Sequence, residues 1–225
     1  MSATPTFKKG GWFFGAAIGL LFAATLGGHG VSEQEKTSET KNTHIGSVDT
    51  LVLNDKSQGN VSINYDQRLH DEIASTSFDD SADVQVKQGA LHVNSGGGLL
   101  LLPLSVKHIR IQNSVEDIYI SVEHGTVMPE LSVTLTGVNV INLSMDGTQK
   151  IDVQQLCVQS QSCDQTSIYL TNSRQLERFD ATLHSGSISI DDARLSQGGL
   201  LKLGADVNLS LNAGTLQNLK IETLP

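Results

Sequence analysis

Apolar and polar residues alternate along most of the chain after Asp49. The alternation comes in short segments of about four or five residues, separated by Gly, Asn, Asp and Ser. Examples are residues 51–53, 61–63, 84–86, 91–93, 109–111 and 118–122. A period of two predicts strands that bury one face. Helical spacing occurs only at 67–74, where Leu69 and Ile73 are four apart, so the sequence predicts an all-β fold.

The C-terminal half has a second, longer period. Pairs of apolar residues with one residue between them recur about every 20 residues. One set is Val133/Leu135, Ile151/Val153, Ile168/Leu170, Ile188/Ile190 and Leu209/Leu211, and a second is Ile141/Leu143, Leu156/Val158, Phe179/Ala181, Leu201/Leu203 and Leu219/Ile221. A two-strand unit that recurs in this way is typical of a β-helix, or β-solenoid, in which each coil buries its apolar face against the next. The alternative is a β-sandwich, which gives no reason for the recurrence, so we favour the solenoid.

Residues 95–104 interrupt the alternation. Three glycines, Gly96 to Gly98, precede a leucine-rich run that contains Pro103. We interpret this stretch as a hinge or long turn, and therefore as a break between residues 44–95 and a coil stack at 105–225. The glycines match neither of the common phosphate-binding patterns, GxxxxGK[ST] and GxGxxG.

The first 30 residues predict export. Lys8 and Lys9 precede an apolar run from Trp12 to Leu26, and small residues follow it up to Gly30. This order is typical of a secretory signal peptide cleaved between Gly30 and Val31. The alternative is an uncleaved inner-membrane anchor facing the periplasm, because the apolar stretch is just long enough to span a bilayer. Both interpretations place the protein outside the cytoplasm, in the periplasm, at the cell surface or secreted.

The segment that follows is polar and without periodicity. We interpret residues 31–43 as a linker, and residues 44–225 as the folded domain. Five of the ten aromatic residues of the chain lie in its first 22 positions. The core of the domain must therefore be built from aliphatic side chains.

The net charge of the domain limits the classes of molecule that it can bind. Without residues 1–30, 13 basic residues stand against 24 acidic ones, a net charge of −11. Such a surface repels phosphate backbones, and the domain has few aromatic side chains for base stacking. We therefore expect no nucleic-acid partner, and membrane contact only through an uncleaved N-terminal segment.

The only cysteines are Cys157 and Cys163. In an oxidising compartment an even pair this close together is expected to form a local disulfide. The alternative is two buried thiols. The spacing is not the CxxC of redox-active pairs, and no histidine lies between Cys163 and His184, so we expect no metal site.

One segment, from Asp117 to Leu143, resembles the auto-transporter adhesin head domain family called GIN. Pro129, Leu131, Leu135 and Gly137 stand where that family has a Pro-x-Leu step followed by a Leu-x-x-x-Gly turn. The segments 48–53, 59–63 and 89–93 resemble its opening strands, so the resemblance spans about residues 45–220. It implies an exported β-solenoid, and the family name suggests a role in adhesion. The stretch at 96–104 and the cysteine loop depart from the family pattern.

No group of residues in the sequence predicts catalysis. Two acidic clusters, Asp79/Asp80/Asp83 and Asp191/Asp192, are interpreted as hydrated turn residues, with a calcium site as an alternative that lacks the usual DxDxDG spacing. His92, His108 and His124 are expected to point outward, and 184–186 is read as an ordinary turn. The polar residues at 139, 142, 154, 155 and 159–162, which are Asn, Gln and Ser, are interpreted as turn residues rather than as ladders inside the solenoid.

We therefore expect a non-enzymatic module of the cell envelope that acts in adhesion or as a scaffold, with no cofactor and no metal or catalytic residues. Its expected partner is a surface protein or glycan, and the end coils are expected to allow self-association. One alternative is an enzyme that acts on extracellular glycans; another is a membrane-anchored envelope sensor. The coils supply only Tyr119, Tyr169 and Phe179 as aromatic residues, so we expect binding through shape and polar contacts rather than through stacking.

Overall fold

The computed structural model describes residues 41–54, 60–77, 83–94, 97–112, 115–122, 125–137, 139–157, 163–212 and 218–225. These residues belong to one compact unit that spans 38–225. The predicted signal or anchor at 1–30 and its cleavage point lie outside the described residues. Among the described residues, no helix is long and apolar enough to cross a membrane.

The secondary structure consists of short strands, as the alternation predicts. Their bounds are β1 Lys41–His44, β2 Thr50–Asn54, β3 Val61–Tyr65, β4 Glu72–Ser77, β5 Asp83–Lys87, β6 Ala90–Asn94, β7 Gly98–Leu102, β8 His108–Gln112, β9 Val115–Val122, β10 Met128–Leu135, β11 Asn139–Met145, β12 Thr148–Gln155, β13 Thr166–Thr171, β14 Arg178–Ile190, β15 Gly199–Leu211 and β16 Leu219–Thr223.

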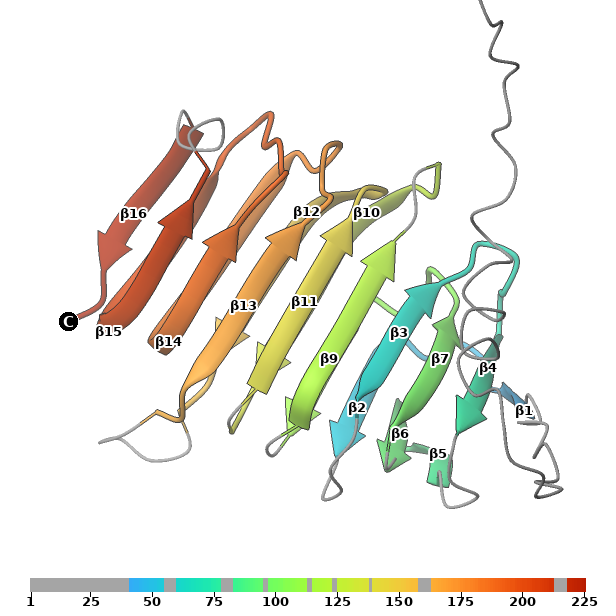
Figure 1. Cartoon of the computed structure of the whole chain (residues 1–225). Coiled ribbons are helices and arrows are strands. Elements are labelled where there is room, and N and C mark those ends of the chain that lie inside the picture. The colour runs from blue at the N-terminus through green and yellow to red at the C-terminus, as the bar shows by residue number, and fades with distance from the viewer. Residues whose placement is uncertain are drawn as a thin grey trace, which may run out of the picture. The chain divides into compact units, whose positions relative to one another are not determined.

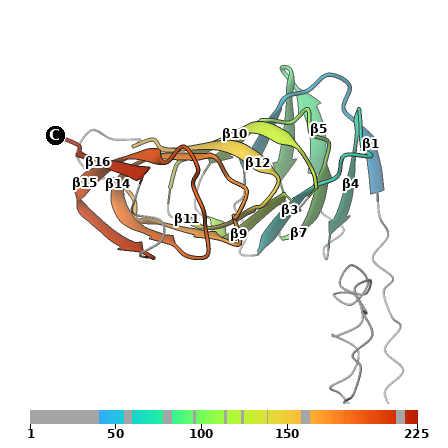
Figure 2. The same cartoon turned by 90° about the horizontal axis from the view of Figure 1, so that it is seen from above.

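The strands form two layers that face each other, as the two views in Figure 1 and Figure 2 show. We call the layer nearer the viewer in Figure 1 the front sheet. It contains, in order, β1, β4, β7, β3, β9, β11, β13 and the second halves of β14 and β15. The back sheet contains β5, β6, β2, β8, β10, β12, the first halves of β14 and β15, and β16. Each coil contributes one segment to each sheet, which confirms the predicted β-solenoid.

Two long strands show how a coil passes from one sheet to the other. Residues 178–182 of β14 pair with β12 in the back sheet, and residues 186–190 pair with β13 in the front sheet. β15 bends in the same way and pairs with both halves of β14. The strand turns the corner within a few residues, so the two sheets stay close enough for their inward side chains to meet.

The register of the back sheet gives the length of each coil. Ile109, Val133, Val153, Ala181, Leu201 and Ile221 occupy equivalent positions on successive strands, at intervals of 24, 20, 28, 20 and 20 residues. The expected interval of about 20 residues is correct for three of the coils. The two sets of apolar pairs in the sequence exchange sheets at the cysteine loop, because Ile151 and Val153 lie in the back sheet whereas Ile168 and Leu170 lie in the front sheet. Leu156, expected in the second set, is half exposed.

The N-terminal coils are not stacked in sequence order. The coil of β2 and β3 lies between the coil of β6 and β7 and the coil of β8 and β9. Antiparallel strands then close this end, with β5 on β6 and β4 followed by β1 on β7. The break expected at 95–104 is therefore wrong for residues 98–102, which form β7. Its leucines pair with β3 and β4 instead of forming a hinge.

The core between the sheets is aliphatic, as the composition requires. Among the described residues its only buried aromatic side chains are Tyr65 and Phe179. Inward positions alternate with outward ones along most of the strands, so Val, Ile and Leu side chains stack in ladders from coil to coil. The Tyr65 hydroxyl has no hydrogen-bond partner in the described part of the chain, and burial raises its pKa.

Candidate functional site

The outer surface of the front sheet is polar and uncharged over five neighbouring strands, β3, β9, β11, β13 and β14, and continues onto β15. We call it the polar face and define it by the outward residues Ser62, Asn64, Tyr119, Ser121, Val140, Asn142, Ser144, Ser167, Tyr169, Thr171, Ser187, Ser189, Asn208 and Ser210. None of these side chains carries a charge. Asp117, Asp191 and Asp206 lie at its borders. Parallel pairing in register brings residues far apart in sequence into straight rows across this face.

One row of the polar face carries two exposed aromatic rings. Tyr119 of β9 pairs with Asn142 of β11, which in turn pairs with Tyr169 of β13. The two tyrosines are 43% and 39% exposed. Neighbouring rows contain hydrogen bonds between side chains, with Ser121 donating to Asn64 Oδ1 at 2.7 Å and Ser187 donating to Ser167 Oγ at 3.0 Å.

The outer surface of the back sheet has a different chemistry. Its outward positions on β8, β10, β12, β14, β15 and β16 carry charges of both signs and include His108, Arg110, Glu130, Lys150, Asp152, Arg178, Asp180, Lys202, Lys220 and Glu222. Neighbouring charges pair, as in the 2.8 Å contact between Arg178 Nε and Asp180 Oδ2. His92 and His108, expected to point outward, are partly exposed or exposed here, whereas His124 lies outside the described residues. The contrast between the two faces is not required for packing.

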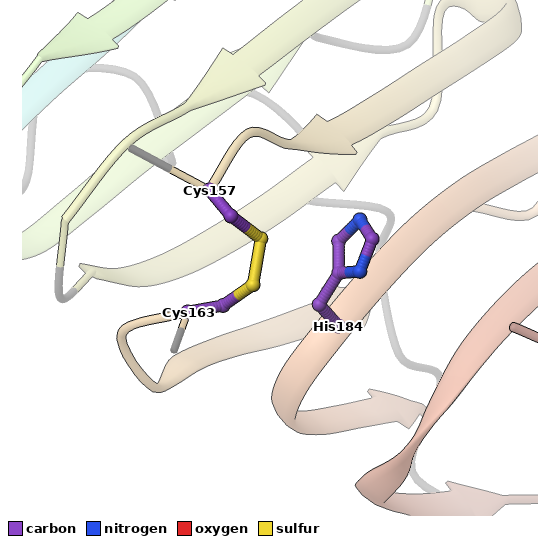
Figure 3. A group of neighbouring side chains, drawn as sticks. All are labelled: Cys157, Cys163 and His184. Atoms are coloured by element: carbon purple, nitrogen blue, oxygen red, sulfur yellow. A yellow bond between two sulfur atoms is a disulfide. The ribbon is translucent and has the colours of Figure 1, made fainter. Parts of the chain in front are cut away.

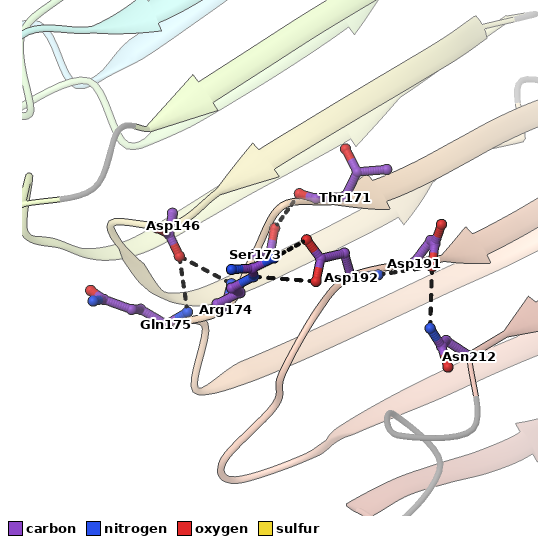
Figure 4. Close-up of polar contacts among 8 residues, drawn as sticks. All are labelled: Asp146, Thr171, Ser173, Arg174, Gln175, Asp191, Asp192 and Asn212. Carbon is purple, nitrogen blue, oxygen red and sulfur yellow. Dashed lines mark hydrogen bonds and ion pairs between the residues drawn. The ribbon is translucent and has the colours of Figure 1, made fainter. Parts of the chain in front are cut away.

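An open pocket of about 580 Å³ lies beside the stacked turns that lead from the front sheet to the back sheet. Its lining includes Leu176 and Leu195, and polar groups from Arg174, Asp192 and Arg194. Figure 4 shows the polar contacts of these turns. Loops at the edge of a rigid scaffold are common places for binding sites.

The aspartates of this region are held by hydrogen bonds. Arg174 forks onto Asp192, with Nη2 to Oδ2 at 2.9 Å and Nε to Oδ1 at 3.2 Å. This contact lowers the pKa of the Asp192 carboxyl, so Asp192 stays ionised at neutral pH. Asp191 accepts from the Asp192 backbone N–H at 3.0 Å and from Asn212 at 3.3 Å. The interpretation of Asp191 and Asp192 as turn residues is confirmed; of the other acidic cluster, Asp79 and Asp80 lie outside the described residues.

Cys157 and Cys163 are joined by a disulfide, with Cα atoms 4.8 Å apart. They lie between β12 and β13, where ten residues make the connection, whereas three residues connect β10 to β11. The disulfide therefore brings the ends of the insertion together, and the chain turns this corner as the shorter coils do. A disulfide is characteristic of proteins in oxidising compartments, which agrees with a protein outside the cytoplasm.

His184 lies beside this disulfide (Figure 3), with its ring nitrogen and the two sulfurs within 4.8 Å of one another. Metals bind cysteine as the thiolate. The bonded sulfurs are not thiolates, so this trio is not a metal site in the oxidised protein.

Reduction of the disulfide is expected to lower stability only modestly. A loop of this length accounts for about 2 kcal/mol on the chain-entropy model. Urea unfolding of the wild type with and without dithiothreitol should show this difference, and a Cys157→Ser/Cys163→Ser variant should match the reduced wild type under both conditions. If the reductant did not change the unfolding midpoint of the wild type, the disulfide would be contradicted.

Two amide side chains lie inside the solenoid, contrary to their interpretation as turn residues. Asn139 is 1% exposed and donates to the carbonyls of Thr136 and Gly137 at 3.1 and 3.0 Å. Gln155 is 3% exposed and bonds to four residues at the next corner. Both fill corners where backbone groups leave the sheet ladder and need other partners. Asn142 and Gln154 point outward, but they lie within β11 and β12 rather than in turns, and residues 159–162 lie outside the described residues.

Comparison with known proteins gives similarity in structure only. No protein-family model matches the chain, and no curated protein matches it by sequence; the resemblance to the GIN family stays a prediction. A crystal structure of a "putative adhesin" from Bacteroides fragilis matches 83% of this chain and 96% of its own length, at 15% identity and a TM-score of 0.45. A second "putative adhesin", from Parabacteroides merdae, covers the same shares at 11% identity and a TM-score of 0.27. The chain is similar in structure to these two proteins.

Proposed function

We propose that this protein is a non-enzymatic binding module of the cell envelope, in adhesion or as a scaffold, and that it docks through the polar face. The observation that carries the proposal is the contrast between the two outer surfaces. The back sheet carries paired charges of both signs, whereas the polar face presents rows of hydroxyl, amide and phenol groups without a charge. Such groups form hydrogen bonds with a partner without the large desolvation cost of burying ions.

The shape of the sheet suits a docking surface. Successive parallel strands lie about 4.8 Å apart, so six strands offer a regular surface whose side chains are held by the ladders beneath them. The preorganised surface loses little conformational freedom on binding. The disulfide supports a location outside the cytoplasm. Whether the N-terminal segment acts as a cleaved signal or as an inner-membrane anchor decides between a periplasmic, surface or membrane-held module.

The open pocket supports a second candidate function, an enzyme acting on extracellular glycans. It brings Asp192 together with Arg174 and Arg194, and a glycoside hydrolase needs two carboxyl groups, one of them a proton donor. The Arg174 contact lowers the pKa of Asp192, which is the opposite of what a general acid requires. We therefore favour binding over catalysis.

Charges introduced into the polar face are expected to abolish docking. The full chain, expressed and purified, would be assayed for binding to isolated envelopes of the source organism. An Asn142→Glu/Ser189→Glu variant should bind at least about tenfold more weakly, since each carboxylate would have to be desolvated on contact. Thr134→Glu/Thr182→Glu places the same two charges on the back sheet and should leave binding unchanged.

Two results would contradict the proposal. Equal binding by all three proteins would show that the polar face is not used. Cleavage of a polysaccharide that disappears in an Asp192→Ala variant would favour the enzyme.

A further inference from the structure

The row formed by Tyr119, Asn142 and Tyr169 is the most distinctive feature of the polar face. The two tyrosines lie on β9 and β13 with β11 between them. They are therefore two strand spacings apart, roughly 9.6 Å. These are the only two aromatic side chains that the described chain exposes as large apolar surface, and the register places them in one line.

From this row we infer that the polar face binds an extended, uncharged polysaccharide, with sugar rings stacked on Tyr119 and Tyr169. The inference rests on the proposed function and names the class of its partner. The small number of aromatic residues in the coils, taken alone, argues against recognition of sugars by stacking. The register of the strands favours stacking, because it brings two tyrosines that are fifty positions apart in sequence into one row.

The chemistry of the row fits a sugar chain. A pyranose ring has faces of C–H groups that pack on an aromatic ring, and an edge of hydroxyls that need hydrogen-bond partners. Tyrosine combines an apolar ring with a polar hydroxyl. Asn142 lies between the two rings, and its amide offers two donors and an acceptor. No hydrogen bond joins the side chains of these three residues to any other described residue, so their polar groups remain available to a ligand.

The distance between the two tyrosine rings fits an extended polysaccharide. Two strand spacings are about the length of two hexose units in an extended polysaccharide, so alternate sugars would meet Tyr119 and Tyr169. The intervening sugar would lie over Asn142. Outward serines at 121, 144, 167 and 187 flank the row on β9, β11, β13 and β14 and supply hydroxyls on both sides of it.

The charge of the protein favours an uncharged polysaccharide over an acidic one. No residue of the polar face could pair with a carboxylate or a sulfate, and without residues 1–30 the net charge is −11. A polyuronate would be repelled at long range and would find no compensating cation on contact. The back sheet carries Arg110, Lys150 and Arg178, but these lie on the opposite surface, and Lys150 and Arg178 have the acidic neighbours Glu130 and Asp180.

The test is affinity electrophoresis of the full chain in gels that contain one soluble polysaccharide each. The neutral probes are hydroxyethyl cellulose, dextran and mannan, and the charged probe is polygalacturonate. We expect retardation by at least one neutral probe and none by polygalacturonate. Tyr119→Ala/Tyr169→Ala should weaken that binding at least about tenfold, each single variant by less, and Tyr119→Phe/Tyr169→Phe should retain most of it because the rings remain.

Val86→Ala is the matched control, because Val86 is also an exposed apolar residue, 46% accessible, but lies on β5 of the back sheet. It should bind as the wild type does. Urea unfolding midpoints would show that the tyrosine variants are folded, which is expected since both side chains are at the surface.

The outcomes separate this inference from the proposed function. Failure of every neutral probe, binding of polygalacturonate, or neutral binding that survives loss of both tyrosines would overturn the inference. If envelope binding still falls in the Asn142→Glu/Ser189→Glu variant, the docking function stands and the partner is of another class, such as a protein. If no envelope binding occurs but the tyrosine row retains a neutral polysaccharide, the inference stands and the envelope partner is wrong.

Discussion

Replacing Gln155 with leucine is expected to destabilise the protein by about 3 kcal/mol or more, although leucine is the more hydrophobic residue. The Gln155 Oε1 accepts from the backbone N–H groups of His184 and Ser185 at 2.8 and 3.1 Å. Its Nε2 donates to the Asp164 carbonyl at 2.5 Å and to Thr166 Oγ1 at 3.2 Å. Leucine would leave the backbone and hydroxyl groups that bond to Gln155 without partners at a buried position. Each hydrogen bond lost from a buried polar group costs about 1–3 kcal/mol. Urea unfolding measures the difference.

The neighbouring residue provides the control for this prediction. Gln154 points outward and hydrogen-bonds to Asp152, so Gln154→Leu should change the free energy of unfolding by less than about 0.5 kcal/mol. Similar effects at the two positions would show that the corner at 184–185 does not depend on Gln155.

Gly186→Ala is expected to be as damaging, or to prevent folding, for a steric reason. Gly186 adopts a φ of 128°, and a Cβ added there would lie 1.9 Å from the Thr166 carbonyl oxygen and 2.7 Å from the Thr166 nitrogen. Backbone atoms of an adjacent coil cannot move away as a flexible side chain can, so β13 and β14 would have to separate at the corner. We expect a loss above about 3 kcal/mol, measured as the urea midpoint or as the yield of folded protein.

Gly89→Ala separates this contact from simple backbone strain. Gly89 also has a positive φ, 77°, but a Cβ there meets nothing within 4 Å. Alanine should therefore cost only the strain of the left-handed conformation, about 1–2 kcal/mol. If Gly186→Ala costs no more than Gly89→Ala, the two coils are not in close contact at this corner.

The coil repeat could be predicted where the connections are short and regular. Ile168, Ile188 and Leu209 were expected to be equivalent, and they pair in register in the front sheet. Between Val153 and Ile168 the same pattern predicts equivalent positions, whereas the two residues lie in different sheets. Apolar spacing shows which residues face inward, but an insertion of unknown shape between two strands hides which sheet the next strand joins.

The candidate site was harder to predict for a related reason. A glutamine at a solenoid corner and a glutamine in a hydrated turn have the same polar neighbours in sequence, so Gln155 and Asn139 could not be recognised as internal. Tyr119 and Tyr169 each resemble an isolated outward residue of a strand. Their relation depends on the register of three strands, which local sequence does not determine.

The position of the β2–β3 coil has a consequence for biosynthesis. Leu51 pairs with Leu91 and Ile109, and Val61 pairs with Gly98 and Ile118, so this coil, the first to be translated, receives both neighbouring coils in full only after residue 122 has been made. From β8 onward, by contrast, each new strand docks on one that already exists. Long-range closure is slow because its entropic cost precedes its contacts. We therefore expect the nascent β2–β3 coil to keep its apolar side chains partly uncovered until β6 to β9 have been made and have docked on it, which makes it the segment most in need of a chaperone.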